Sequence, residues 1–179
     1  MKKRNPEKTC DCNKLAESVD GWMLSNKLYT GKCFTYYKNG NIESKSEFLK
    51  GKIYGHLVSY YPNGIIEEEV EWKNGKASGK VKYYFKSGQL SEEGSIIREY
   101  KDGIWKSYYE NGQLKSLEHW KENVMIDSCI GYFINGNIEM KGYWENGIQE
   151  GKWTFYDSLG RIDGYLIYVN GKPVEKIKN

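Results

Sequence analysis

The sequence has little of what helices, membrane spans and nucleic-acid interfaces need. Of its 179 residues only Ala16 and Ala77 are alanine and three are proline, whereas 16 are tyrosine and 6 are tryptophan. This composition disfavours helices and suits β-strands. No apolar run approaches ~18 residues, so no membrane span is expected. The net charge of +3 is too small to indicate, by itself, nucleic acid or an anionic membrane as a partner.

What the chain does have is a repeating pattern with a period of 24 residues. Glycine closes a turn in six copies, at Gly40, Gly64, Gly88, Gly112, Gly136 and Gly160. A tyrosine stands four residues before each glycine, at Tyr36, Tyr60, Tyr84, Tyr108, Tyr132 and Tyr156. An isoleucine or leucine stands two residues after each glycine, from Ile42 to Ile162. Six matches at three linked positions indicate a repeat protein.

Each repeat is predicted to be one β-hairpin with a connection to the next. Aromatic and β-branched residues flank an Asn-Gly turn, which is a strong hairpin signal. A two-residue turn would need positive φ at the Asn39 register, where Leu159 also stands, and leucine is a poor choice for positive φ. We therefore expect a three-residue loop, a type I turn followed by one left-handed glycine. The predicted turns are 38–40, 62–64, 86–88, 110–112, 134–136 and 158–160.

This turn predicts which side chains share a face of the sheet. Tyr36 should lie opposite Ile42 with Phe48 on the same side, so that their registers form one stripe. The opposite face would carry the registers that begin at Cys33 and Tyr37. Tyrosine and tryptophan are enriched at protein interfaces, so the stripe is the expected partner-binding site. Its candidate members are Tyr60, Tyr84, Tyr108, Tyr132, Trp72, Trp120 and Trp144.

The predicted fold is all-β, an elongated repeat array of six 24-residue antiparallel β-hairpins that form one twisted meandering sheet. At ~4.8 Å per strand this sheet would be about 58 Å long. Residues 1–20 form a non-repeat N-terminal segment, and residues 21–179 form the repeat domain, with 21–30 as a capping strand. The stretch 96–102 lacks the Asn-Gly connection of other repeats, and the tail 173–178 is expected to be an edge strand protected by proline and lysine.

A catalytic or metal-binding set of residues is not recognisable in the chain. His56 and His119 stand about 25 Å apart in such a sheet and are expected on the surface. Neighbours on a strand point to opposite faces, so the acidic run is expected to be a solvated charged strand. The run comprises Glu67, Glu68, Glu69 and Glu71. No phosphate- or dinucleotide-binding glycine pattern occurs. The sequence therefore predicts a protein that is not an enzyme and has no metal site or cofactor.

The cysteines and the N-terminus bear on the cellular location. Cys33 and Cys129 share a register but would lie about 38 Å apart, too far for a disulfide, and both are expected to be small buried strand residues. Cys10 and Cys12 form one Cys-x-Cys pair, a weak signal for metal binding or oxidation. The N-terminus has no apolar h-region, so a cytoplasmic location is expected, with an exported or lipid-anchored protein as the alternative if the sequence is N-terminally trimmed.

The repeat pattern resembles the MORN-repeat-variant family. The likeness covers about residues 28–172 and is closest over 103–114, which reads GIWKSYYENGQL, with half of it repeated at 151–156, GKWTFY. The resemblance implies stacked antiparallel hairpins and no catalytic motif. Many bacterial members of the family are labelled as antitoxins of the YwqK type, and other MORN proteins are described as scaffolds, dimerisation modules or phospholipid binders.

The expected function is that of a non-enzymatic protein-binding repeat module. Its partner would be a protein, such as a toxin, or a second copy of the chain. The alternative is a membrane-surface, phospholipid-associated or exported scaffold protein. Lysines are interleaved with glutamates and leave no basic groove, so no nucleic-acid partner is expected. No small-molecule substrate is expected either.

Overall fold

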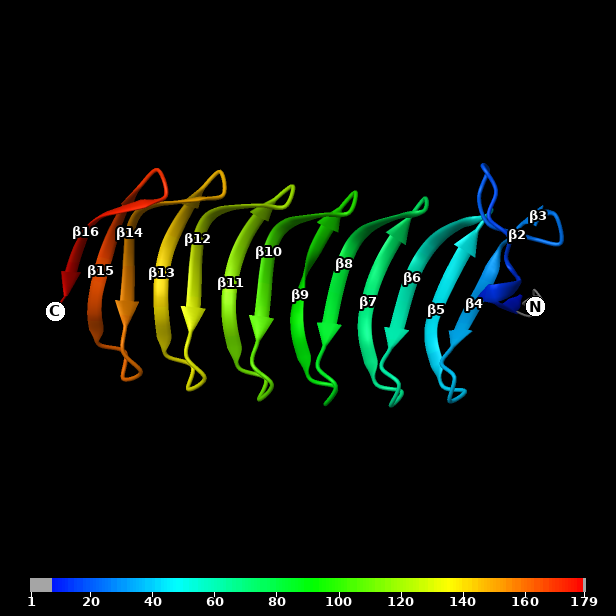
Figure 1. Ribbon diagram of the computed structural model, residues 1–179, viewed down its shortest axis with the longest axis horizontal. Helices are drawn as coiled ribbons and strands as arrows, with labels where there is room; N and C mark the ends of the chain where they lie inside the picture. The colour runs from blue at the N-terminus through cyan, green and yellow to red at the C-terminus, as the bar shows by residue number, and fades with distance from the viewer. Residues whose placement is uncertain (1–7, 179) are drawn as a thin grey trace, which may run out of the picture. The chain divides into compact units, whose positions relative to one another are not determined.

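The computed structural model describes residues 8–178, and the predicted all-β fold is confirmed (Figure 1). The described residues contain no helix long and apolar enough to cross a membrane. The N-terminal elements are β1 (Thr9–Asp11), the 3-10 helix η1 (Cys12–Lys14), β2 (Met23–Leu24) and β3 (Lys27–Leu28). The next strands are β4 (Gly31–Tyr36), β5 (Ile42–Leu49), β6 (Lys52–Tyr60), β7 (Ile66–Lys73) and β8 (Lys76–Tyr84). The remaining strands are β9 (Leu90–Ile97), β10 (Tyr100–Tyr108), β11 (Leu114–Lys121), β12 (Val124–Tyr132), β13 (Ile138–Glu145), β14 (Ile148–Tyr156), β15 (Ile162–Val169) and β16 (Lys172–Lys178).

The strands follow a meander. A 14-stranded sheet has the order β1-β4-β5 and then every strand in sequence to β16, while β2 and β3 form a separate small hairpin. The chain divides into two compact units, Met1–Gly88 and Gln89–Asn179, and each is described by itself. From β4 to β8 and from β9 to β16 each strand pairs antiparallel with its neighbour. The last strand, β16, pairs only with β15 among the described strands, as predicted for the C-terminal edge.

The predicted three-residue turn with a left-handed glycine is confirmed. In the first repeat the Gly40 N–H donates to the Tyr37 carbonyl at 2.9 Å, and the Tyr37 N–H donates to the Asn41 carbonyl at 2.9 Å. Gly40 has φ 87°, whereas Asn39 is not among the residues with positive φ. The corresponding glycines of the other repeats have φ between 83° and 90°.

The turns at the opposite ends of the strands, which join one hairpin to the next, have two residues. Both residues are left-handed, as are Asn74 (φ 54°) and Gly75 (φ 79°). This is the backbone of a type I′ turn. Arg98 (φ 52°) and Glu99 (φ 76°) form the same kind of turn between β9 and β10 without any glycine. The missing Asn-Gly pair therefore does not interrupt the hairpin, but it places two ordinary side chains in a conformation that costs each of them about 1–2 kcal/mol.

Replacing Glu99 by glycine should therefore stabilise the protein, by about 1 kcal/mol, because glycine adopts a φ of 76° without steric cost. The measurement is the urea midpoint of unfolding. Asn74→Gly is the matched control, since asparagine already tolerates the left-handed region and little change is expected. A midpoint for Glu99→Gly no higher than that of Asn74→Gly would contradict the strain at this turn.

A second irregularity follows the three-residue turn in five of the hairpins. Tyr36 pairs with Ile42, as predicted, but Thr35 pairs with Ser44, so that Glu43 is left without a partner on β4. The same shift occurs in the hairpins β6–β7, β10–β11, β12–β13 and β14–β15. A one-residue bulge moves every following side chain of that strand to the other face of the sheet.

The predicted single stripe of tyrosines and tryptophans is therefore wrong. Beyond the bulge, Phe48 pairs with Gly31 and shares a face with Cys33 instead of Tyr36. We call the face that carries the Cys33 and Phe48 registers the core face, and the face that carries the Tyr36 register the tyrosine face. Trp72, Trp120 and Trp144, which share the register of Phe48, lie on the core face.

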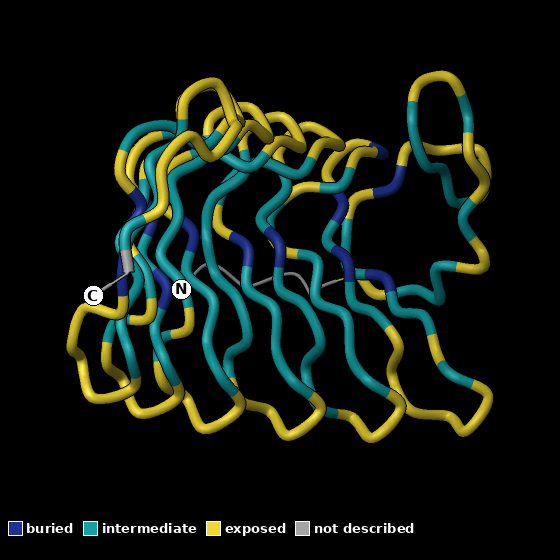
Figure 2. Tube along the Cα trace, turned by 60° about the vertical axis from the view of Figure 1, so that its left-hand side comes forward, coloured by how far each residue is buried: buried dark blue, intermediate teal, exposed yellow. Residues whose placement is uncertain are grey.

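The core face holds most of the buried side chains, at mid-strand, while the turns at both edges are exposed (Figure 2). In the second unit each buried tryptophan lies over a glycine of the preceding strand. A Cβ atom on Gly94 would lie 2.3 Å from the Trp105 ring, and one on Gly142 would lie 2.2 Å from the Trp153 ring. The absence of a side chain at these two glycines therefore makes room for the indoles. Residues less than 4% exposed on this face are Cys33, Val81, Trp105, Cys129 and Trp153.

The N-terminal segment is joined to the repeats of the first unit. Residues 1–20 were expected to lie outside the period, yet β1 pairs in parallel with β4 and forms the sheet edge. Cys10 lies directly opposite Cys33, with 4.8 Å between the Cα atoms, and the two form a disulfide. Cys33 is buried, as predicted, but the sequence did not predict its disulfide. Cys12 and Cys129 are free, and Cys129 is buried as predicted.

The same segment also covers the first hairpin of the core face. Tyr29 is 1% exposed, and its hydroxyl oxygen lies 3.1 Å and 2.9 Å from the carbonyl oxygens of Lys8 and Lys32. Tyr29 packs with Phe48, and Trp22 lies against this cluster. The first repeat therefore has a core of its own beneath a cap, which is how terminal repeats of such arrays are closed.

Candidate partner-binding surface

The four predicted tyrosines lie on the tyrosine face, Tyr60 and Tyr84 in the first unit and Tyr108 and Tyr132 in the second. All four are half-buried. Three of these tyrosines stand directly opposite a branched aliphatic residue of the next strand, Tyr60 opposite Ile66, Tyr108 opposite Leu114 and Tyr132 opposite Ile138. Such cross-strand aromatic–aliphatic pairs stabilise a sheet and still leave part of the ring accessible.

Two of these tyrosines are held by carboxylates. The Tyr84 hydroxyl donates to Glu69 Oε2 at 2.8 Å, and the Tyr108 hydroxyl donates to Glu93 Oε1 at 2.8 Å. The acceptors stand fifteen residues before the tyrosines, on the preceding strand of the same face. Hydrogen bonds to a charged acceptor are strong, so each ring is fixed in one orientation before any partner arrives.

The environment of Tyr108 raises the pKa of its hydroxyl to about 12, first by burial and then by the hydrogen bond and the negative charge of Glu93. Because the pKa of Tyr108 is raised in the folded state, its protonated hydroxyl stabilises the fold. This contribution to the free energy of unfolding is complete below the unfolded tyrosine pKa of 10.0 and is lost as the pH rises toward 12.

Ultraviolet titration of tyrosinate should therefore show a late step near pH 12 that is absent from the Tyr108→Phe variant. In Glu93→Gln the step should move toward lower pH without reaching the ordinary value, because burial remains. A difference titration between wild type and Tyr108→Phe centred at the ordinary tyrosine pKa of about 10 would contradict this arrangement.

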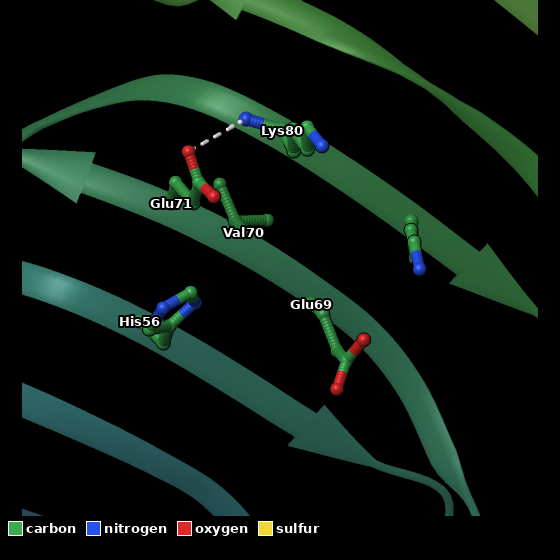
Figure 3. Close-up of a pocket in the computed structure, with 6 residues that line it drawn as sticks. His56, Glu69, Val70, Glu71 and Lys80 are labelled. Carbon is green, nitrogen blue, oxygen red and sulfur yellow. Dashed lines mark hydrogen bonds between the residues drawn. The ribbon is translucent and has the colours of Figure 1, made fainter.

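Figure 3 shows a charged cleft of ≈ 200 Å³ in the first unit, lined by strands β6, β7 and β8. His56 of β6 lies directly opposite Glu71 of β7, and the Glu71 carboxylate accepts the backbone N–H of Lys80 on β8 at 3.0 Å. Glu69 lines the same cleft while it accepts the Tyr84 hydroxyl. The cleft is therefore continuous with the tyrosine face and gives it a polar rim of both charge signs. Its lining residues are His56, Glu69, Val70, Glu71, Lys80 and Lys82.

The acidic run is not the solvated charged strand that was predicted. Glu67, Glu68, Glu69 and Glu71 are all half-buried. Glu69 and Glu71 accept hydrogen bonds on the tyrosine face, whereas Glu68 points to the core face, where burial raises the pKa of its carboxyl group. The predicted alternation of faces along the strand is correct. The glutamates are not simply solvated, however, because Glu69 and Glu71 hold Tyr84 and the backbone of Lys80 in place.

The predicted tryptophans occupy the core face, where Trp120 and Trp144 contact other residues of their own unit. Trp144 packs edge-on against Trp153 with ring centroids 5.5 Å apart. The Trp120 indole donates to Glu118 Oε2 at 3.0 Å, and the Lys101 ammonium lies 5.1 Å from its ring centroid. Tyrosines and tryptophans of the candidate site are thus not brought together, and a partner docked on one set does not reach the other.

The structure also locates the remaining chemical candidates. His56 is exposed, as predicted, whereas His119 is half-buried and its Nδ1 lies 2.8 Å from the Ser128 carbonyl oxygen. Among residues 8–178 no group of three or more His, Cys, Asp and Glu side chains is arranged to hold a metal ion. The carboxylates that fix the tyrosines were missed by sequence reasoning. Their only signal in the sequence is a glutamate fifteen residues before the repeat tyrosine. Just two repeats have it, with Glu69 before Tyr84 and Glu93 before Tyr108.

Four segments match the family described as MORN repeat variant, at residues 29–50, 53–74, 77–97 and 101–122. Each segment covers one hairpin, from β4–β5 to β10–β11, and the hairpins β12–β13 and β14–β15 repeat the same turn and bulge. MORN repeats are in general protein- or membrane-binding modules and are not typically catalytic. No curated protein matches the chain.

Proposed function

We propose, from its MORN repeat variants and its fixed tyrosines, that this protein is a non-enzymatic module that binds a protein partner through the tyrosine face. The observation that carries the proposal is the pair of Tyr–carboxylate hydrogen bonds, Tyr84 to Glu69 and Tyr108 to Glu93. Large amphipathic rings that are already immobilised contribute contact area at a low cost in conformational entropy.

The choice of face follows from how the two faces are used. On the core face, Trp105 and Trp153 are 2% exposed and are occupied in holding neighbouring strands together. The tyrosine face also carries half-exposed side chains such as Tyr143, which is 44% exposed, and Ile162, which is 48% exposed. An apolar aromatic centre with a charged rim is the composition of a protein–protein interface.

The charge of this face favours a protein over a lipid surface as the partner. Glu69 and Glu71 are interleaved with Lys80 and Lys82 around the cleft, so this part of the face has no excess positive charge to attract anionic headgroups. On the resemblance to YwqK-type antitoxins, we propose a toxin protein as the first candidate partner, with a second copy of the chain as the other.

We further propose that the protein works in an oxidising compartment. The expectation from the N-terminal sequence was cytoplasmic, with export as the alternative. Disulfides persist mainly in exported proteins and are rare where thiols are kept reduced, so the Cys10–Cys33 bond favours the exported alternative.

The experiment is a pull-down of the tagged protein from its own cells with two matched double variants. Tyr84→Ser/Tyr108→Ser removes the two fixed rings, and Trp72→Leu/Trp120→Leu changes the core face in the same two units. One stoichiometric protein should be retained by wild type and by the folded tryptophan variant and lost from the folded tyrosine variant. Equal retention by both variants would remove the tyrosine face from the proposal, and circular dichroism establishes that each variant is folded.

A further inference from the structure

A second cavity, of ≈ 460 Å³, lies on the core face of the first unit beneath the N-terminal cap. Its walls come from η1 and the segment after it, and from β4, β5 and β6. The volume is within the range of sites that hold small organic molecules, about 300–1,000 Å³. Its lining residues are Cys12, Asn13, Leu15, Trp22, Thr35, Ser44, Ser46, Phe48 and Ile53.

The lining decides the charge of any occupant. Leu15, Trp22, Phe48 and Ile53 give apolar walls, and no residue that lines the cavity is an Asp, Glu, Lys, Arg or His. An ionised ligand would lose its hydration here without a counter-charge, which is strongly unfavourable. The Cys12 thiol does not supply one, because burial raises its pKa above the ordinary thiol value and keeps it protonated.

One hydroxyl in the cavity is available for hydrogen bonding, beside the amide of Asn13, which is exposed. The Thr35 and Ser44 hydroxyls bond to each other at 2.7 Å. Ser46 is 6% exposed and lines the cavity, yet its hydroxyl makes no hydrogen bond to another described residue. The Ser46 hydroxyl is not among the buried unpaired atoms of the described residues, so it is accessible from the cavity and can contact a ligand's single polar group.

We propose that this cavity is a binding site for an uncharged, mostly apolar small molecule with one hydrogen-bonding group. The apolar body lies among Leu15, Trp22 and Phe48, and its polar group meets the Ser46 hydroxyl. The site lies on the core face and is formed in part by the cap, so it is separate from the tyrosine face, and its occupancy and the binding of a protein partner can be tested independently.

The test uses two fluorescent probes that share one aromatic skeleton. N-phenyl-1-naphthylamine is neutral and has one N–H group, and 8-anilino-1-naphthalenesulfonate is the same skeleton with a sulfonate. The neutral probe should bind with one-to-one saturation and quench Trp22 fluorescence, and the anionic probe should bind at least about 10-fold more weakly, because its sulfonate would be buried without a partner. Equal affinities for the two probes would overturn the proposal.

Two variants locate the bound probe. Leu15→Trp fills the cavity from the cap and should weaken binding at least about 10-fold, whereas Leu159→Trp places the same ring on an exposed turn and should leave binding unchanged. Ser46→Ala should weaken binding about 2- to 10-fold, as loss of one hydrogen bond does. Binding that is unaffected by Ser46→Ala and by Leu15→Trp, or that does not saturate, would show that the probe lies elsewhere. If Leu15→Trp does not fold, Ser46→Ala alone decides.

Discussion

Replacing Trp153 by alanine is expected to lower the free energy of unfolding by about 3–5 kcal/mol, as removal of a large buried aromatic side chain does. The indole is 2% exposed and packs edge-on against Trp144 and Tyr168, with ring centroids 5.5 Å and 5.9 Å away. It also covers Gly142, which has no side chain to fill the space that alanine would leave. The measurement is urea unfolding followed by circular dichroism.

Three further variants separate packing from other effects of that substitution. Leu159→Ala, at a residue 72% exposed, should change stability by less than about 0.5 kcal/mol. Trp153→Phe should cost much less than alanine, since the Trp153 N–H has no hydrogen-bond partner to lose among the described residues. Gly142→Ala should destabilise, because its Cβ would lie 2.2 Å from the ring. If Gly142→Ala left the stability unchanged, that result would contradict the close approach of the Trp153 ring to Gly142.

Removal of the disulfide is expected to destabilise the N-terminal cap by about 3 kcal/mol. Cys10 and Cys33 are 23 residues apart, and opening a loop of about this length restores that much conformational entropy to the unfolded chain. β1 has only three residues, so its parallel pairing with β4 has little else to hold it. The measurement is thermal unfolding of Cys10→Ser beside wild type with and without dithiothreitol.

Reduced wild type should unfold like Cys10→Ser, and dithiothreitol should leave the variant unchanged. Cys12→Ser, which removes a free thiol from the same segment, should keep the full response to reductant. A thiol count in denaturant without reductant should find two free thiols, those of Cys12 and Cys129. Four reactive thiols, or a melting curve that ignores reductant, would contradict the disulfide and with it the proposed oxidising compartment.

The sequence was sufficient for the hairpins because their turns depend on local chemistry. The glycine at the third loop position takes a positive φ in every repeat, and this requirement, with Leu159 at the position before it, identified the turn and the pairing of Tyr36 with Ile42. The period then predicted the strand order from β4 onward, since each of these strands lies beside its neighbour in the chain.

The faces could not be predicted beyond the bulge at Glu43. That bulge needs no left-handed glycine. Its positions in other repeats hold Glu67, Lys115, Glu139 and Asp163, and a charged residue is as common at ordinary strand positions of this chain, so it does not mark an extra residue. One unmarked residue reversed the assignment of every tryptophan in the candidate site. The disulfide was hidden for a different reason: it depends on β1 returning to lie parallel to β4, a contact that no local pattern encodes.

The most direct measurement of the central claim is the affinity of the captured partner for two single variants of the first unit, by isothermal titration calorimetry. Tyr84→Ser changes the tyrosine face, and Trp72→Leu changes the core face one strand away. If the tyrosine face binds the partner, Tyr84→Ser weakens binding by about 30-fold, the effect of losing an interface hot spot, and Trp72→Leu leaves the affinity within about 3-fold. The reverse order, with Trp72→Leu the damaging change in a folded protein, would contradict the account and assign the partner to the core face.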